Sequence, residues 1–158
     1  MTLDTNEILY KITKSLSLSI DNVLEVYKLE DFNMDKTHLI NILSKRLDKN
    51  FEKASFEELG VFLDGFISFK RGKSENKNKN EVELTNNLIL KKLRIALELK
   101  EPEIEIIFSL ADIELSKQQL SSLFRKEGHK NFKLCSDELL ISFINGLDEF
   151  YFVGDEVE

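Results

Sequence analysis

Apolar residues recur every three or four positions through most of the chain, which is the spacing of amphipathic helices. In the first half this pattern predicts helices that begin near Asn6 and after Ser19, Asp35 and Ser55. Ser19 is expected as an N-cap, and Ser55 and Glu58 have the spacing of a capping box, in which each side chain accepts a backbone N–H of the other residue. No strand is apparent, so we expect an all-α fold.

The second half of the chain repeats the first. When the sequence is shifted by 81 residues, about 20 of roughly 65 aligned positions are identical. The matches include Ile8 and Leu9 with Ile89 and Leu90, Leu16 and Leu18 with Leu97 and Leu99, Lys49–Phe51 with Lys130–Phe132, and Leu59, Phe62 and Gly65 with Leu140, Phe143 and Gly146. In the second copy Pro102 fits a first helical turn, and Ser116 and Gln119 have capping-box spacing. We therefore expect two tandem four-helix units.

The two units are separated by a polar stretch rich in lysine and asparagine, which lacks apolar periodicity and is typical of a linker. We place the first repeat at residues 1–71, the linker at 72–84, the second repeat at 85–153 and an acidic tail at 154–158. Because a small helical unit buries little apolar surface alone, we expect the repeats to dock in a pseudo-twofold arrangement. The alternative is two beads joined only by the linker.

Composition narrows the class of protein. A chain of 158 residues with 42% hydrophobic residues, one proline and six glycines favours long helices over a β-sandwich. The net charge of −7 disfavours binding to nucleic acid or anionic membranes by bulk electrostatics. There is no signal-peptide pattern, no apolar run long enough to span a membrane, and one cysteine. We therefore expect a cytoplasmic protein with no membrane partner.

Two recurring features have structural explanations. The sequence Lys-Asn-Phe occurs between the third and fourth helices of both units, where it is either a ligand-contacting turn or a helix C-cap with asparagine in the left-handed conformation. We favour the cap. Gly65 and Gly146 lie inside the fourth helices, where a glycine costs about 1 kcal/mol relative to alanine. A close helix–helix approach would explain both glycines.

Reactive side chains are few. His38, His129 and Cys135 are the soft metal ligands of the chain, and none has the paired spacing of a zinc site. Cys135 follows a turn near a helix start, where a thiolate would be favoured, but its counterpart in the first repeat is Ala54, which indicates a small packing position. We expect no metal, no cofactor and no catalytic residue.

Positive charge gathers between the repeats. From Lys70 to Arg94 there are eight lysines and arginines against three glutamates, although the whole chain is acidic. This basic belt is either a solvated linker attracted to the acidic helices or a strip that contacts an anion or RNA. The belt residues that we take as binding candidates are Lys70, Arg71, Lys73, Lys91, Lys92 and Arg94. Aromatic residues that could stack on bases are absent from the belt, which weakens the RNA interpretation.

The second and third helices of the second repeat have roughly helix-turn-helix spacing. The further binding candidates on that third helix and after it are Gln118, Gln119, Arg125, His129, Lys130 and Asn131. Helical hairpins with this spacing are common in proteins that do not bind DNA, so the pattern alone does not establish a nucleic-acid function.

Several segments resemble the bacterial YehS-like family. They are Asn86–Asn87, Leu90–Ala96, Leu99–Lys100, His129–Phe132, Cys135–Asp137, Phe143, Asn145–Leu147 and Lys70–Lys73. The resemblance covers nearly the whole chain and implies a two-copy domain of unknown function, with no established activity, substrate or catalytic residue to transfer. One departure is that Asp48 stands in the first repeat where the second has His129.

These observations leave three classes of function open. A duplicated helical protein without a reactive constellation is best interpreted as a non-enzymatic binding or scaffold protein, and we expect its partner to be another protein. The first alternative is nucleic-acid binding through the helix-turn-helix-like hairpin and the basic belt. The second is an enzyme whose site forms between the repeats.

Overall fold

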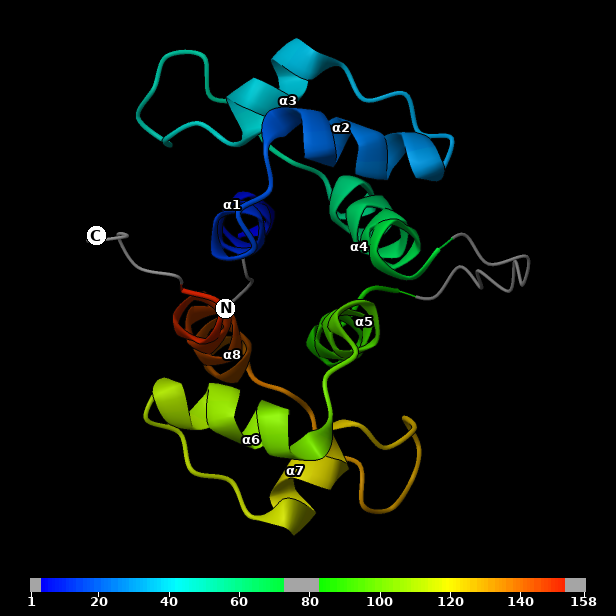
Figure 1. The fold of residues 1–158 in the computed structure, drawn as a ribbon, viewed down its shortest axis with the longest axis vertical. Helices are drawn as coiled ribbons and strands as arrows, with labels where there is room; N and C mark the ends of the chain where they lie inside the picture. The colour runs from blue at the N-terminus through cyan, green and yellow to red at the C-terminus, as the bar shows by residue number, and fades with distance from the viewer. Residues whose placement is uncertain (1–3, 73–82, 153–158) are drawn as a thin grey trace, which may run out of the picture.

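The computed structural model describes residues 4–72 and 83–152 of the chain, and within these ranges it contains helices and no strands. The helices are α1 Thr5–Ser15, α2 Ile20–Leu29, α3 Lys36–Ile42, α4 Phe56–Arg71, α5 Asn86–Leu97, α6 Glu101–Leu110, α7 Lys117–Leu123 and α8 Asp137–Phe150 (Figure 1). The all-α prediction is confirmed. The residues 73–82 of the predicted linker and the predicted acidic tail lie outside the described ranges.

The helices begin where the sequence supplies capping side chains. The hydroxyl group of Ser19 accepts the N–H of Asn22 and that of Ser55 accepts the N–H of Glu58, each within a complete capping box. Ser116 caps α7 in the same way, with Gln119 as its reciprocal partner. These contacts satisfy backbone donors that the first helical turn leaves without intrahelical partners. The predicted helix starts are therefore confirmed at these positions.

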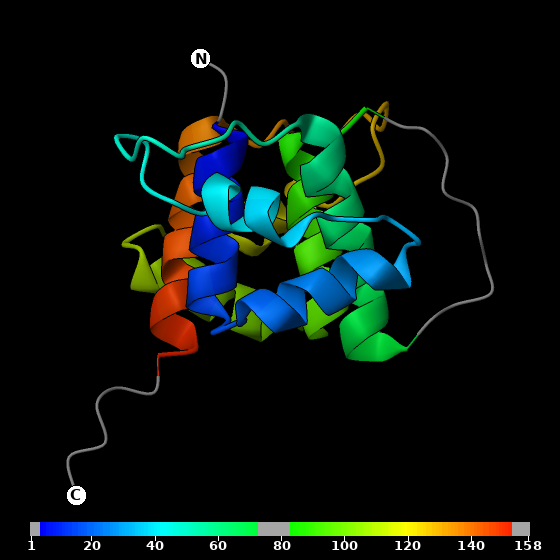
Figure 2. The same ribbon diagram turned by 90° about the horizontal axis from the view of Figure 1, so that it is seen from above.

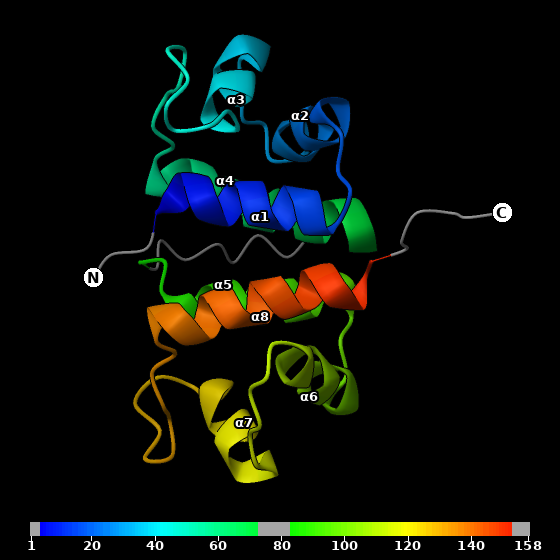
Figure 3. The same cartoon turned by 90° about the vertical axis from the view of Figure 1, so that its left-hand side faces the viewer.

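Four helices form the centre of the molecule, and each repeat supplies two of them. Among these four helices, α1 packs closely against α8 and α4 against α5, so the closest central pairs join different repeats (Figures 1 and 3). Helices α2 and α3 lie on the outer side of α4, and α6 and α7 lie on the outer side of α8. Seen from above in Figure 2, α2 of the first repeat crosses the central helices. The two repeats thus share one bundle in a pseudo-twofold arrangement.

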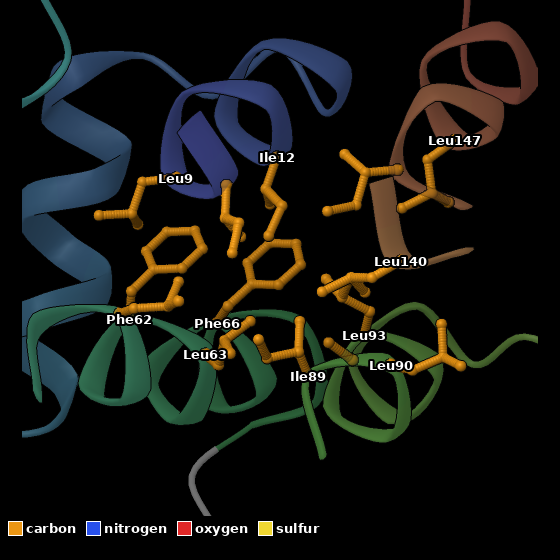
Figure 4. Close-up of a cluster of buried hydrophobic side chains, with 14 of the residues drawn as sticks. Leu9, Ile12, Phe62, Leu63, Phe66, Ile89, Leu90, Leu93, Leu140 and Leu147 are labelled. Atoms are coloured by element: carbon orange, nitrogen blue, oxygen red, sulfur yellow. The ribbon is translucent and has the colours of Figure 1, made fainter. Parts of the chain in front are cut away.

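Apolar side chains from all four central helices meet in one core (Figure 4). Leu9 and Ile12 of α1 and Phe66 of α4 are at most 1% exposed. Leu93 of α5 and Leu140 of α8 are fully buried. Because these residues come from both repeats, the docking predicted from the size of each unit is confirmed, and independent beads are excluded.

Polar contacts between the repeats also follow the pseudo-twofold relation. The ammonium group of Lys92 on α5 forms an ion pair with Asp64 on α4. At the equivalent positions, Lys11 on α1 donates to the side-chain oxygen of Asn145 on α8 at 3.2 Å. Each contact joins the first and last long helices of opposite repeats, as the two halves of an isologous dimer interface would.

The outer helices cross the central ones at glycines. A Cβ atom at Gly65 would lie 2.2 Å from the carbonyl oxygen of Val26 on α2, and one at Gly146 would lie 2.0 Å from the carbonyl oxygen of Ile107 on α6. Both distances are far below van der Waals contact with backbone, which cannot move as a flexible side chain can. The close helix approach predicted for these glycines is therefore confirmed.

Substituting Gly146 by alanine should lower the free energy of unfolding by about 2 kcal/mol or more, because the added methyl group overlaps the Ile107 carbonyl. Gly60 offers a matched control on α4, since a Cβ there meets no atom within 4 Å. Gly60→Ala should raise the free energy of unfolding by roughly 0.5–1 kcal/mol through helix propensity alone. Urea titration of both variants measures the two values, and a stabilised Gly146→Ala protein would contradict the crossing argument.

Candidate functional site

A buried asparagine anchors the loop between α7 and α8. The side-chain amide of Asn87 donates to the carbonyl oxygens of Leu123 and Lys133, at 2.9 Å each. Its oxygen accepts the backbone N–H of Cys135 at 2.9 Å. Both amide protons and the oxygen are therefore used, and one side chain of α5 fixes both ends of the loop.

The first repeat contains the same arrangement. Asn6 donates to the carbonyl oxygens of Ile42 at 3.0 Å and Glu52 at 2.8 Å, and accepts the N–H of Ala54 at 2.9 Å. All four positions correspond to those of the second repeat under the 81-residue shift. This role of the two asparagines was not predicted from the sequence. The available signal was an identical asparagine on the otherwise apolar face of a helix in both copies.

Each anchored loop borders a hollow. The first-repeat hollow, of about 510 Å³, is lined by Asn6, Tyr10, Ser44, Lys45, Arg46 and Phe51 among others. The second-repeat hollow, of about 500 Å³, is lined by the equivalent residues Asn87, Lys91, Arg125, Lys126, Glu127 and Phe132 among others. The duplication has thus produced the same concave feature twice, with different side chains around it.

At the first-repeat hollow a single acid contacts two cations. Arg46 forms an ion pair with Asp4, and its guanidinium carbon lies 5.2 Å from the centroid of the Phe51 ring. The ammonium group of Lys53 lies 3.7 Å from the same carboxylate. The Asp4 carboxylate is thus engaged by two cations, while Lys45 forms no ion pair with a described residue.

The second-repeat hollow has no such pairing. Thr85 occupies the position of Asp4, so the acid that holds two cations in the first repeat is missing. Lys91, Arg125 and Lys126 are exposed, and none forms an ion pair with another described residue. Two predicted binding residues, Lys91 and Arg125, are thereby brought together although they are far apart in the sequence.

Other residues of the basic belt are engaged in internal contacts. Lys92 pairs with Asp64 across the repeats, as described above. Arg71 donates to the carbonyl oxygen of Ile95 at 3.2 Å. The guanidinium carbon of Arg94 lies 4.7 Å from the centroid of the Phe124 ring. These three side chains support the structure, and the described residues of the belt do not form one continuous surface. Lys73 lies outside the described residues.

Helix α7 presents part of the predicted hairpin. It covers Lys117–Leu123 and has only two turns. Gln118 and Gln119 are both exposed, and the side-chain oxygen of Gln119 accepts the N–H of Ser116 at 2.8 Å within the capping box. Because the side-chain oxygen of Gln119 is used in the cap, this short helix offers few free polar groups to a DNA groove.

The Lys-Asn-Phe sequence is not a helix C-cap, which corrects our prediction. Helix α3 ends at Ile42 and α7 ends at Leu123, well before the motif. Neither Asn50 nor Asn131 is among the described residues with a positive φ. Lysine and asparagine instead occupy the middle of a four-residue turn, because its last N–H, that of Phe132, donates to the carbonyl oxygen of His129 at 2.9 Å.

The turn leaves polar side chains on the surface. His129, Lys130 and Asn131 are exposed. The backbone N–H of Asn131 donates to Nδ1 of His129 at 3.0 Å, which fixes the orientation of the imidazole relative to the turn. Phe132 packs inward against the second-repeat hollow. The motif is therefore an exposed turn, and contact of this turn with a ligand stays a prediction.

A third cavity, of about 460 Å³, lies between the repeats at the C-terminal ends of α1, α4 and α5. Its polar lining includes Lys70, Glu98 and Tyr151. Burial and the nearby Glu103 carboxylate raise the pKa of Tyr151, so its hydroxyl group stays protonated at neutral pH. Lys70 is the one belt residue placed here, apart from the other candidates.

Cys135 lies near the end of the asparagine-anchored loop, and its side chain is buried. Burial, with a smaller effect of the Asp137 carboxylate, raises its pKa to about 12. A thiol protonated at neutral pH is a poor nucleophile, and its counterpart Ala54 is equally buried, so both fill the same small space. Among the described residues no group of three or more histidine, cysteine or acidic side chains is arranged to hold a metal ion.

The first repeat alone contains a histidine held between two carboxylates. Nδ1 of His38 contacts Glu52 and Nε2 lies 2.8 Å from Glu58, while the amide of Asn41 also donates to Glu52 at 2.7 Å. Burial lowers the pKa of His38, but its hydrogen bonds to the two carboxylates outweigh this effect and raise the pKa above 6.5. The second repeat has Gln119 at this position.

Replacing Asn87 by alanine should lower the free energy of unfolding by roughly 2–4 kcal/mol, because two carbonyls and one N–H lose their partners in a buried site. Asn131→Ala, at an exposed position of the same loop, should change it by less than about 0.5 kcal/mol. Thermal and urea unfolding measure both variants. Equal effects would show that the buried amide does not anchor the loop.

The raised pKa of His38 predicts a pH-dependent stability. The favourable contribution is complete below the unfolded pKa of about 6.5 and is lost as the pH rises through the higher folded pKa. The free energy of unfolding should therefore fall as the pH rises from about 6.5 through the folded pKa. His38→Gln, which copies the second repeat, should flatten this dependence, whereas His129→Gln should leave it intact. An unchanged slope in His38→Gln would refute the assignment.

Comparison with known proteins agrees with the duplication. A family model described as "Protein of unknown function (DUF1456)" matches residues 5–72 and again residues 86–151. The Uncharacterized protein YehS of Escherichia coli (strain K12) is 31% identical over 145 residues, which cover 90% of this chain and 93% of that protein. No solved structure is matched. The resemblance to YehS-like proteins is confirmed, and the chain belongs to the DUF1456 family, whose domain it carries twice.

Proposed function

We propose that this chain is a non-enzymatic binding protein whose partner is another protein. The observation that supports the proposal is the pair of equivalent hollows beside the α3–α4 and α7–α8 loops. Each loop is fixed by hydrogen bonds from a buried asparagine on a central helix, and these bonds hold the loop in place at the border of the hollow. Binding residues commonly lie on loops that a rigid scaffold positions.

The chemistry around these hollows favours binding over catalysis. An activated nucleophile needs a base within hydrogen-bonding reach, and the thiol of Cys135 instead points to the carbonyl oxygen of Ser136 at 3.5 Å. Both ring nitrogens of His38 are occupied by carboxylates. The inter-repeat cavity, where we considered an enzyme site, contains Lys70 and Tyr151 but no nucleophile paired with a base among its described residues. No described helix is long and apolar enough to cross a membrane.

Affinity capture from a bacterial lysate tests this proposal when wild-type bait is compared with a variant whose hollows are filled. Glu7 and Leu88 occupy equivalent positions at the two hollows, so Glu7→Trp/Leu88→Trp should obstruct both. We expect a stoichiometric protein that the wild type retains and the filled variant loses, with similar melting temperatures for the two baits. Recovery of no protein, or of the same protein by both baits, would contradict binding through the hollows.

Nucleic-acid binding is the second candidate, and one observation favours it. Arg125, Lys126, Lys130 and Lys133 are all exposed on the loop beside the second-repeat hollow. Against it, three cations of the basic belt are engaged in internal contacts. Phosphate contacts are strongest at low salt, so titration with mixed DNA and RNA at about 50 mM salt is the sensitive test. Tight binding of DNA or RNA at low salt that weakens steeply with added salt would favour a nucleic-acid function.

A further inference from the structure

We propose that the second-repeat hollow binds a short acidic peptide segment with an apolar anchor residue, and that the first-repeat hollow does not. The inference rests on the proposed function and names the chemistry of the partner. It assigns different roles to the two copies of the domain.

The two hollows allow a comparison within one molecule. They have nearly the same volume, about 510 and 500 Å³, and equivalent elements form them. The same asparagine hydrogen bonds fix the loops beside them. A difference in what they bind must therefore come from the residues that line them.

The two hollows differ most in the charged residues around them. In the first repeat, Asp4 holds both Arg46 and Lys53, so an incoming carboxylate would have to displace an existing acid. In the second repeat the equivalent of Asp4 is a threonine, and Lys91 and Arg125 replace a tyrosine and a serine. Glu127 and Leu134 stand where the first repeat has Arg46 and Lys53, so the cations of the second hollow occupy different positions. The second hollow presents cations without described acidic partners, which is complementary to an anion.

The remaining lining favours a peptide over a nucleic acid. Leu88 and Phe132 give the hollow an apolar wall that suits a buried aliphatic or aromatic side chain. Arg94 covers one face of the Phe124 ring, so a base cannot stack on that face. Glu83 and Glu127 also line the hollow and would repel a continuous row of phosphates, whereas a peptide can space its carboxylates to avoid them.

Two lysines provide a matched test. Lys45 and Lys126 are equivalent, exposed and free of ion pairs with described residues, and each lines one hollow. Lys45→Glu and Lys126→Glu change the net charge equally. The probe is a fluorescein-labelled glutamate-rich peptide with a single phenylalanine, followed by fluorescence anisotropy with the full chain. Lys126→Glu should weaken binding about tenfold, and Lys45→Glu by less than about twofold.

Three outcomes would overturn the inference. Equal weakening by both variants would show that bulk charge controls binding. A peptide with glutamine in place of glutamate that binds equally well would exclude recognition of carboxylates. Single-stranded RNA that binds with the same dependence on Lys126, where the peptide does not bind, would assign the hollow to nucleic acid.

The lysate capture separates failure of this inference from failure of the proposed function. If Lys126→Glu bait still retains a protein that Glu7→Trp/Leu88→Trp bait loses, the chain binds a protein partner, but acidic recognition in the second-repeat hollow is wrong. If wild-type bait retains no protein, the proposed function itself is wrong. Both are supported when wild-type and Lys45→Glu baits retain a protein that Lys126→Glu bait loses, and the glutamate-rich peptide shows the same dependence on Lys126.

Discussion

The apolar core shared by the two repeats is the interaction on which the structure depends. Helix α1 lies against α8 and α4 against α5, so neither repeat contains a complete bundle of its own. Leu9 and Phe66 of one repeat and Leu93 and Leu140 of the other are buried in the same core (Figure 4). Removing either repeat would expose most of this apolar surface to water, which opposes folding of a single unit. The pseudo-twofold relation then places an equivalent loop and hollow on each half.

Two further constraints act on backbone groups and fix the outer layer to this core. Gly65 and Gly146 let α2 and α6 cross the central helices at a distance that excludes any Cβ atom. Asn6 and Asn87 replace missing backbone partners at both ends of each loop. The glycine crossings and the asparagine hydrogen bonds both involve backbone carbonyl or amide groups. The surrounding side chains can therefore differ between the two repeats while the backbone keeps the same path. This explains how the hollows keep one shape although most lining residues have changed.

Features that depend on local sequence or on the internal repeat could be predicted without the structure. Helix starts at Ser55 and Ser116 followed from capping chemistry, and the role of Gly146 followed from the cost of a glycine inside a helix. The sequence could not show which helices pair, since amphipathic periodicity identifies a buried face but not its neighbour. The same limitation hid the long-range contacts of Asn87. It also made the basic belt look continuous, although Arg94 stacks on a phenylalanine distant in the sequence.

The shared core also explains why the two copies could diverge so unevenly. The first repeat holds its polar groups in internal contacts, with His38 between two carboxylates and Arg46 on Asp4. The second repeat lacks both arrangements and leaves Lys91 and Lys126 without described acidic partners. Since the two repeats share one core, stabilising contacts in the first also oppose unfolding of the second. Unpaired surface cations add little to stability. They can therefore persist in the second repeat, because the internal contacts of the first repeat stabilise the shared core.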